Sequence, residues 1–215
     1  MKIVSLIPAR KGSKGIKNKN LINLCGKPLI HYSIQASINS LVNETWVSSD
    51  SDEILETSKN LGAKTIERPS EFSGDNATSE SALIHFAEKI DFDILVFIQC
   101  TVPLIESQDI NQGIEKMKTF DSVVSVTETH HMFWDANGPL YDINNRLRRQ
   151  NSIKRYIETG SFFIISKEKL LKFSNRLSGS IGFVEIPKHR SFDIDGYDDL
   201  KIIKTIINSK EYSYE

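Results

Sequence analysis

The chain has 215 residues, a length that fits one domain with a substantial buried core, with or without an appendage. Its 27 basic and 28 acidic side chains give a formal net charge of -1, which argues against general binding to nucleic acid or to a membrane surface. Two cysteines are too few for a disulfide framework.

No stretch approaches the roughly 20 consecutive apolar residues of a membrane span. The first apolar stretch is too short for the core of a secretion signal and runs straight into Arg10 and Lys11. We therefore expect a cytoplasmic protein with no membrane partner.

The first part of the chain alternates short apolar runs with segments of helical periodicity. Residues 2–8 predict a buried strand, and a long turn rich in Gly, Lys and Asn follows it. Pro28 suits the first turn of a helix. A second strand at 44–50 precedes a helix that can be capped at 50–51 and ends at Gly62. The pattern continues with a brief strand near 64–66, a helix near 79–90, the strongest strand at 92–99, a helix near 108–117 and a strand at 121–128.

Strands separated by helices predict a mostly parallel sheet with helices on both faces, because parallel strands need crossover connections. Residues 129–158 break this rhythm with an Asn-Gly turn, scattered aromatic and basic residues and no clear core face. We expect an excursion there, either a hairpin that meets a second subunit or a mobile loop. Strands resume at 160–166 and 181–187, and a last helix is expected at 197–208. The prediction is a single α/β domain over 1–215 with a projecting dimerisation segment.

Positive charge is concentrated directly after the first strand, in the segment PARKGSKGIKNKN at 8–20. A glycine-rich turn between a strand and a helix is a usual place for backbone amides to bind phosphate, and lysines there add neutralising charge. A solvated lysine-rich loop has the same composition. Gly12 and Gly15 do not fit the G-x-G-x-x-G spacing, and the Gly-Lys pair at 26–27 lacks the rest of a Walker A motif. A phosphate site of another kind is the remaining interpretation.

A second signal is SFDIDGYDDL at 191–200. Asp193 and Asp195 flank one residue, so in an extended segment both carboxylates point the same way, which suits Mg²⁺ held together with substrate phosphates. The alternative is an acidic helix N-terminus, with Asp198 and Asp199 complementing the helix dipole. Paired with a basic phosphate loop, the two acids favour phosphoryl or nucleotidyl transfer.

Seven segments, in order, resemble the acylneuraminate cytidylyltransferases, the CMP-sialic acid synthetase group. They are IPARKGSKGIKNKN, VSSD at 47–50, ERPSEF with GDNATSE between 67 and 80, QCTVPL at 99–104, RQ at 149–150, ETGSFFI at 158–164 and DIDGYDDL. The resemblance implies a nucleotide-diphospho-sugar transferase-like fold. It also implies that a nine-carbon or related eight-carbon 2-keto-3-deoxy sugar acid attacks the α-phosphate of CTP through its anomeric hydroxyl, giving a CMP-sugar and pyrophosphate without a covalent enzyme intermediate.

The resemblance also implies roles for individual residues, Mg²⁺ as cofactor and a homodimer. Ser13 and Ser79 can instead be turn and cap residues, and Gln99 a polar strand end. The base that deprotonates the sugar hydroxyl is either Asp195 or a metal-bound hydroxide. The implied catalytic residues are Arg10, Lys19 and Asp195; the nucleotide-binding residues are Ala9, Arg10, Ser13, Lys14, Gly15, Lys19, Asn20, Arg68 and Ser79; the sugar-binding residues are Gln99, Arg149 and Thr159; and the metal ligands are Asp193 and Asp195.

Departures from the family pattern fall at positions expected around the sugar. Ile105 stands where an arginine is expected, Thr159 where an asparagine is expected and Trp134 in the place of a lysine. They leave room for other nonulosonates, such as legionaminate-like or pseudaminate-like acids. Two alternatives stay open: a transferase of the same fold that uses another nucleotide or sugar, and a non-catalytic nucleotide-binding regulator. The adjacent histidines at 130–131 would point to opposite faces of a strand, which argues against a metal site there.

Overall fold

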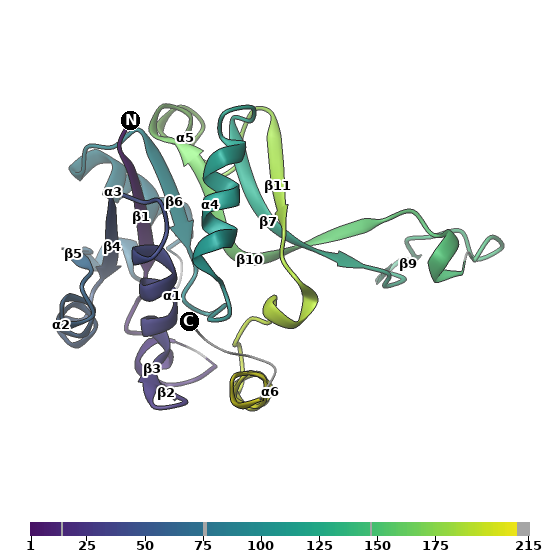
Figure 1. Ribbon diagram of the computed structural model, residues 1–215, viewed down its shortest axis with the longest axis horizontal. Coiled ribbons are helices and arrows are strands. Elements are labelled where there is room, and N and C mark those ends of the chain that lie inside the picture. Colours follow the sequence, from purple (N-terminus) through teal and green to yellow (C-terminus); the bar gives the residue numbers. More distant parts are fainter. Residues whose placement is uncertain (14, 75–76, 147, 210–215) are drawn as a thin grey trace.

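A computed structural model describes residues 1–13, 15–74, 77–146 and 148–209. Lys14, which the resemblance places in the nucleotide loop, lies outside the described residues. The centre of the fold is a seven-stranded sheet with the order β11-β7-β10-β6-β1-β4-β5 (Figure 1). Its strands are β1 (Ile3–Pro8), β4 (Glu44–Ser49), β5 (Lys64–Glu67), β6 (Ile94–Ile98), β7 (Ser122–Thr129), β10 (Arg155–Ser166) and β11 (Ile181–Glu185).

The predicted mostly parallel sheet is confirmed, with one reversed strand. β1 is parallel to β4 and β6, β4 to β5, and β11 to β7, whereas β10 runs antiparallel to both of its neighbours. Parallel neighbours need a crossover connection, but β7 and β10 are joined through the arm without a crossover helix, so β10 can return in the opposite direction.

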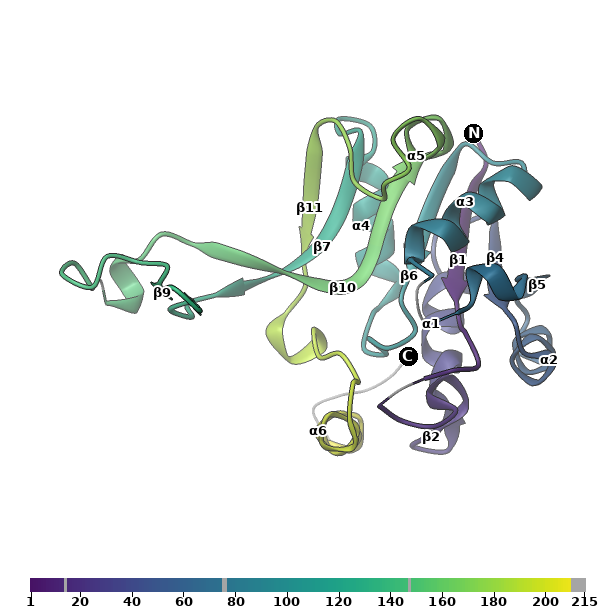
Figure 2. The ribbon, with the colours of Figure 1, turned by 180° about the vertical axis from the view of Figure 1, so that it is seen from behind.

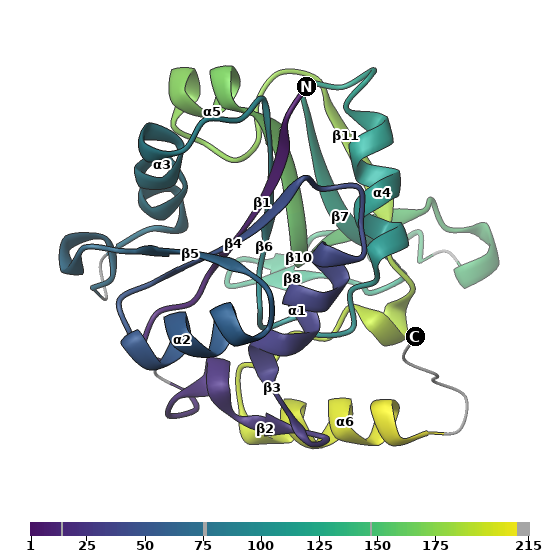
Figure 3. The same ribbon diagram turned by 60° about the vertical axis from the view of Figure 1, so that its left-hand side comes forward.

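Side chains of the central strands alternate between two apolar layers, as the two-residue period of a strand requires. In β6, Val96 and Ile98 belong to one buried cluster, whereas Leu95 and Phe97 belong to the other. Helices cover both faces, with α1 and α4 on one side of the sheet and α3 and α5 on the other (Figure 3). The helices are α1 (Leu29–Ile38), α2 (Asp52–Asn60), α3 (Ser79–Lys89), α4 (Ser107–Lys116), α5 (Lys167–Phe173) and α6 (Tyr197–Asn208).

Short elements fill the connections between these helices and strands. Gly62 ends the α2 region with φ of +93°, as its position predicts, because a left-handed residue is most easily a glycine. α5 was not predicted. None of the described helices is long and apolar enough to cross a membrane. The short elements are the hairpins β2 (Asn23–Leu24) with β3 (Lys27–Pro28) and β8 (Trp134–Asp135) with β9 (Gly138–Pro139), and the 3₁₀ turns η1 (Lys19–Leu21), η2 (Ser70–Phe72), η3 (Arg149–Asn151) and η4 (Lys188–Arg190).

A long arm projects from the body of the molecule, as Figure 2 shows. It starts as a two-stranded ribbon in which Arg155 of β10 pairs with Thr129 of β7 and Glu158 pairs with Val126. The β8–β9 hairpin lies farther out, around the predicted Asn-Gly turn. Residues 155–158 are strand, and as part of this ribbon they belong to the arm that occupies the predicted excursion at 129–158. Only Tyr156 of this stretch packs against the core, while Arg155, Ile157 and Glu158 are exposed, and the sequence shows no strand pattern there.

Candidate active site

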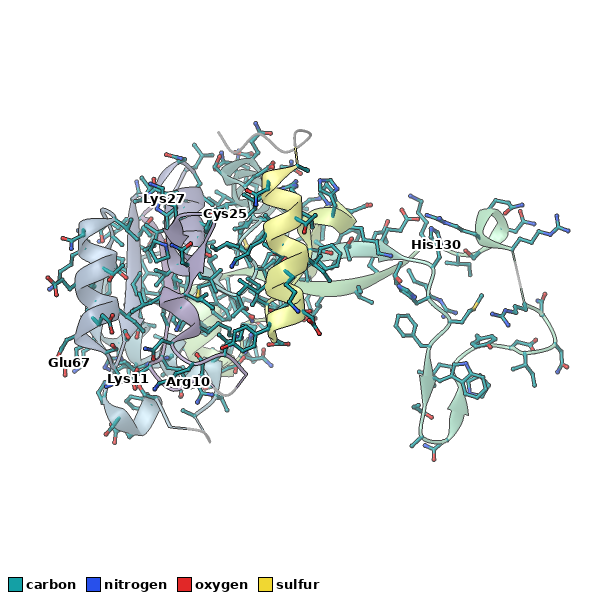
Figure 4. All side chains as sticks on the ribbon, turned by 90° about the horizontal axis from the view of Figure 1, so that it is seen from below. Arg10, Lys11, Cys25, Lys27, Glu67 and His130 are labelled. Carbon is teal, nitrogen blue, oxygen red and sulfur yellow. The ribbon has the colours of Figure 1, made fainter. Side chains whose placement is uncertain are left out.

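The candidate site lies at the edge of the sheet where the parallel strands β1, β4, β5 and β6 end. Ligands of open α/β sheets bind outside the carboxyl ends of the strands. The basic loop follows β1, Asp50 follows β4, Arg68 follows β5 and Gln99 follows β6. Figure 4 looks at the molecule from this side, with Arg10 and Lys11 on the body and His130 far out on the arm.

Lys19 links the basic loop to the acidic segment before α6. Its Nζ donates to the carbonyl oxygen of Ile194 at 2.7 Å and lies 3.4 Å from Oδ1 of Asp195. Gly15 makes a second close approach, because a Cβ at this position would lie only 2.1 Å from the carbonyl oxygen of Asp195. The loop after the first strand and the acid pair near the other end of the chain thus form one cluster.

The two carboxylates suit a divalent cation. Desolvation raises the pKa of Asp193, the nearby Asp195 carboxylate raises it further, and a hydrogen bond from Thr101 and the charge of Lys19 oppose the rise. A cation between two like charges would relieve their repulsion, and carboxylate oxygens are ligands that Mg²⁺ prefers. Over the described ranges no group of three or more His, Cys, Asp and Glu side chains could hold a metal. Further ligands would have to come from the substrate or water.

The helix reading of this segment holds for its other two acids. Asp199 Oδ2 accepts hydrogen bonds from the backbone nitrogens of Asp195 (3.0 Å) and Gly196 (2.8 Å) and so caps α6. Asp198 pairs with Lys201 at 2.9 Å on the helix surface. The segment therefore contains both a carboxylate pair that faces the basic loop and an acidic helix start.

Asn20 is the second residue of the loop with fixed partners. Its Nδ2 donates to the carbonyl oxygen of Arg10 at 2.9 Å, and its Oδ1 accepts from the thiol of Cys100 at 2.8 Å. Asp50 Oδ1 accepts from the backbone nitrogen of Lys11 at 2.8 Å. The backbone nitrogen of Ala9, a predicted nucleotide contact, donates to Ser48 O at 2.9 Å.

Arg68 is a buried cation with unpaired hydrogen-bond donors. Its side chain is 6 % exposed, and its Nε and Nη2 have no hydrogen-bond partner among the described residues. Burial lowers its pKa and so does the charge of Arg10, while the charge of Asp50 raises it. Buried guanidinium donors are costly unless they meet an acceptor, which makes Arg68 a candidate contact for a ligand with carbonyl or ring-nitrogen acceptors.

The remaining predicted nucleotide residues are Arg10, Ser13 and Ser79. Arg10 donates from Nη1 to the carbonyl oxygen of Gly74 at 3.2 Å. Ser79 is the first residue of α3, but Thr78 is the cap, because its Oγ1 accepts from Ser81 N at 3.2 Å. The cap reading of Ser79 is therefore wrong. Ser13 lies half-buried in the basic loop.

The predicted sugar-binding residues do not all lie together. Gln99 packs against Gly160, where a Cβ would lie 3.3 Å from its Oε1, and Gly160 has φ of +71°. Thr159 is buried, and its hydroxyl hydrogen-bonds Ser125 Oγ at 2.8 Å and Ser161 Oγ at 2.9 Å. Ile105, which stands where an arginine is expected, is also buried and packs in the hydrophobic core of the chain.

Arg149 lies on the arm, at the start of η3, and does not join the Lys19–Asp195 cluster of its own chain. It lines a cavity of about 380 Å³ together with Glu128, His130 and Lys188. Trp134, the other departure, is 64 % exposed on the same arm. Sequence reasoning missed Asp50, Cys100 and Thr101 as partners of the site, although each lies at or within two residues of the end of a predicted parallel strand, where site residues are expected.

Comparisons with known proteins identify the family and the fold of the chain. A family model described as "Cytidylyltransferase" matches residues 4–201. N-acylneuraminate cytidylyltransferase B of Danio rerio is 36% identical over 203 residues, which cover 89% of this chain and 48% of that protein. Pseudaminic acid cytidylyltransferase of Campylobacter jejuni is 30% identical over 223 residues, 96% of each chain.

The chain spans about half the length of the N-acylneuraminate cytidylyltransferases it matches. Among solved structures, that of CMP:2-keto-3-deoxy-manno-octonic acid synthetase complexed with CTP superimposes with a TM-score of 0.76 at 18% identity. The match covers 96% of this chain and 98% of that one, and at this identity it shows the fold.

Proposed function

The chain belongs to the cytidylyltransferase family, and on that premise we propose that it transfers CMP from CTP to the anomeric hydroxyl of a 2-keto-3-deoxy sugar acid and releases pyrophosphate. The observation that carries the proposal is the contact between Lys19 and Asp195, 176 positions apart in the sequence. The names of the relatives, which act on N-acylneuraminate or pseudaminic acid, support a nonulosonic acid as acceptor.

The nucleotide end of the proposed reaction uses the basic loop. Arg10 and Lys19 stabilise the negative charge that develops on pyrophosphate as it leaves, because fixed cations act most strongly where charge appears in the transition state. Arg68 offers its unpaired donors to the acceptors of the cytosine ring. Ala9, Ser13, Lys14, Gly15, Asn20 and Ser79 complete the proposed nucleotide contacts.

Asp193 and Asp195 are the proposed ligands of Mg²⁺. When bound, the ion supplies positive charge beside the phosphates and lowers the cost of bringing another anion to them. Asp195 is also the chain's own candidate for receiving the proton of the sugar hydroxyl. Among the described residues, the long contact with Lys19 is the one hydrogen bond that the Asp195 carboxylate accepts. The carboxylate is therefore available to bind the ion or to receive the proton.

The sugar end of the site is proposed to need a second copy of the chain. Gln99 is available on the body, whereas Arg149 lies on the arm and can serve a site only across an interface. Several large apolar side chains of the arm are exposed, which supports the proposed homodimer. They include Trp134 (64 %), Leu140 (57 %), Ile143 (63 %) and Ile153 (81 %).

A cytoplasmic location remains a proposal, supported by the two cysteines, both of which are unpaired thiols. The test of the function is to incubate the purified protein with Mg²⁺, each nucleoside triphosphate and a panel of eight- and nine-carbon sugar acids, and to measure pyrophosphate. We expect release with CTP and a nonulosonic acid. Turnover of UTP with a sugar phosphate would instead support another transferase of this fold, and thermal stabilisation by CTP without product would support a regulator.

A further inference from the structure

Cys100 is a buried residue that has no assigned role. It lies two residues after β6, is 3 % exposed, and belongs to the cluster on the face of the sheet covered by α1 and α4. Its Sγ lies 2.8 Å from Oδ1 of Asn20, a residue 80 positions earlier in the chain. Apolar packing alone does not require this contact.

The direction of this hydrogen bond follows from the other partner of Asn20. The amide of Asn20 lies between Cys100 and the carbonyl oxygen of Arg10, which can only accept. The NH₂ group must therefore face Arg10, and the amide oxygen must face Cys100. The thiol is then the donor. Burial raises the pKa of Cys100 to about 12, so the thiol keeps the proton it donates at neutral pH.

The same short segment also holds the acidic side of the site. Thr101, the next residue, hydrogen-bonds the side chain of Asp193, and its carbonyl oxygen accepts from the backbone nitrogen of Ile194 at 2.8 Å. Residues 100 and 101 thus connect the basic loop and the acid pair to the end of one strand. A change in the orientation of the Asn20 amide would break the contact between the basic loop and residue 100.

We propose that Cys100 is a positioning residue. Its thiol donates a hydrogen bond to Asn20 and thereby fixes the Asn20 amide and the backbone of Arg10 for nucleotide binding. This inference rests on the proposed function, because it assigns the contact a purpose in binding CTP. The role needs a hydrogen-bond donor of this size and does not need thiol chemistry.

The kinetic test compares Cys100→Ala, which removes the donor, with Cys100→Ser, which keeps one. For Cys100→Ala we expect kcat/KM for CTP to fall about 3- to 30-fold, the range of one to two hydrogen-bond equivalents, with the KM for the sugar acid unchanged. Cys100→Ser should recover most of the loss. Cys25→Ala removes the other thiol, whose Sγ lies 4.0 Å from the carbonyl oxygen of Lys204, and serves as the matched control.

A spectroscopic test reads the bond without any turnover. In the Cys25→Ser background Cys100 is the sole thiol, and its infrared S–H stretching band should lie at the frequency of a hydrogen-bonded thiol. Adding Asn20→Ala should move the band to that of a free thiol. Wild-type kinetics in Cys100→Ala, equal losses in the Ala and Ser variants, or a band that Asn20→Ala does not move would each overturn the inference. If no nucleotide is turned over, the proposed function fails, and the infrared band still decides whether Cys100 orients Asn20.

Discussion

The strand-end cluster on the body and the projecting arm differ in how their predicted site residues are held within the chain. On the body, Lys19, Asn20 and Asp193 each have partners from distant parts of the sequence. On the arm, Arg149 lines an open cavity and Ile153 is 81 % exposed. The contrast supports the proposal that the nucleotide end of the site is built within one subunit, whereas the sugar end needs a second copy of the chain.

The largest effect is expected from Asp195→Asn on the body. The substitution keeps the shape of the side chain and removes the charge that would hold a divalent ion against the phosphates. We expect turnover to fall at least ~100-fold with the fold intact, as for loss of a metal ligand at a phosphoryl centre. Steady-state pyrophosphate release and a thermal melt measure the two quantities. Near-normal turnover would refute the metal role.

A matched pair of glycines tests how tightly the loop is built. In Gly15→Ala the new Cβ would meet the carbonyl oxygen of Asp195 at 2.1 Å, so the loop must move away from the acid pair. In Gly12→Ala the new Cβ has nothing within 4 Å. We expect Gly15→Ala to lower kcat/KM for CTP about 30-fold, equivalent to a local strain of roughly 2 kcal/mol, and Gly12→Ala to stay within about 3-fold.

Equal effects of the two glycine variants would show that the close approach does not matter for activity. The melting temperatures provide the control, since both positions lie in the same loop. A large fall in melting temperature for Gly15→Ala alone would assign its effect to folding.

Much of the body could be predicted from the sequence, because its strands are continuous apolar runs and the motifs follow their ends. The strand predicted at 92–99 is β6, the helix predicted at 197–208 is α6, and Lys19 of the basic loop contacts Asp195 of the acidic segment. The contact of Cys100 with Asn20 could not be predicted, since it joins residues far apart in the chain and a cysteine in a loop has no distinctive pattern.

The arm was predicted less well, and the directions of some side chains could not be predicted. Residues 155–158 pair in a ribbon that leaves the core, so no apolar alternation marks them. Thr159 and Ile105 were assigned to the surroundings of the sugar by resemblance, yet both are buried in this chain. A family motif gives the position along the sequence, but the direction of a side chain depends on its neighbours.

A smaller effect, restricted to one substrate, is expected from Arg149→Ala on the arm. If the guanidinium meets the sugar carboxylate of a neighbouring subunit, its loss should raise the KM for the sugar acid about 10-fold and leave CTP binding nearly unchanged. Titrating each substrate at saturation of the other separates these values. Equal weakening of both ligands would place Arg149 at the nucleotide.

Mixed dimers of two variants test whether the body of one subunit and the arm of the other form one site. Arg149→Ala subunits have an intact body, and Asp195→Asn subunits have an intact arm. If each site combines the body of one subunit with the arm of the other, a hybrid dimer contains one site with both defects and one with neither. Mixing the two variants should therefore restore activity measured at limiting sugar acid. No recovery on mixing, with exchange of subunits verified by mass spectrometry, would mean that each arm serves only its own chain.

The smallest effect compares two carboxylates that bind lysines, Glu44 on the body and Glu128 on the arm. Hydrogen bonds from Lys64 and then Trp46 lower the pKa of Glu44 to about 2, and its side chain is 20 % exposed. Lys154 is the main cause of the lowered pKa of Glu128. A depressed carboxyl pKa stabilises the fold above the unfolded pKa, and this stabilisation is lost as the pH falls through the folded value.

For Glu44 the loss should therefore occur between about pH 4.5, its ordinary pKa, and about pH 2. At pH 7 we expect Glu44→Gln to lower the free energy of unfolding by about 1 kcal/mol, less than the shift alone would give because exposed lysines are screened by solvent. The deficit should shrink as the pH approaches 2. Glu128→Gln should leave denaturant midpoints unchanged at every pH, since the arm contributes few buried contacts to the fold. A deficit for Glu128→Gln as large as that for Glu44→Gln would mean that the arm is part of the cooperative core.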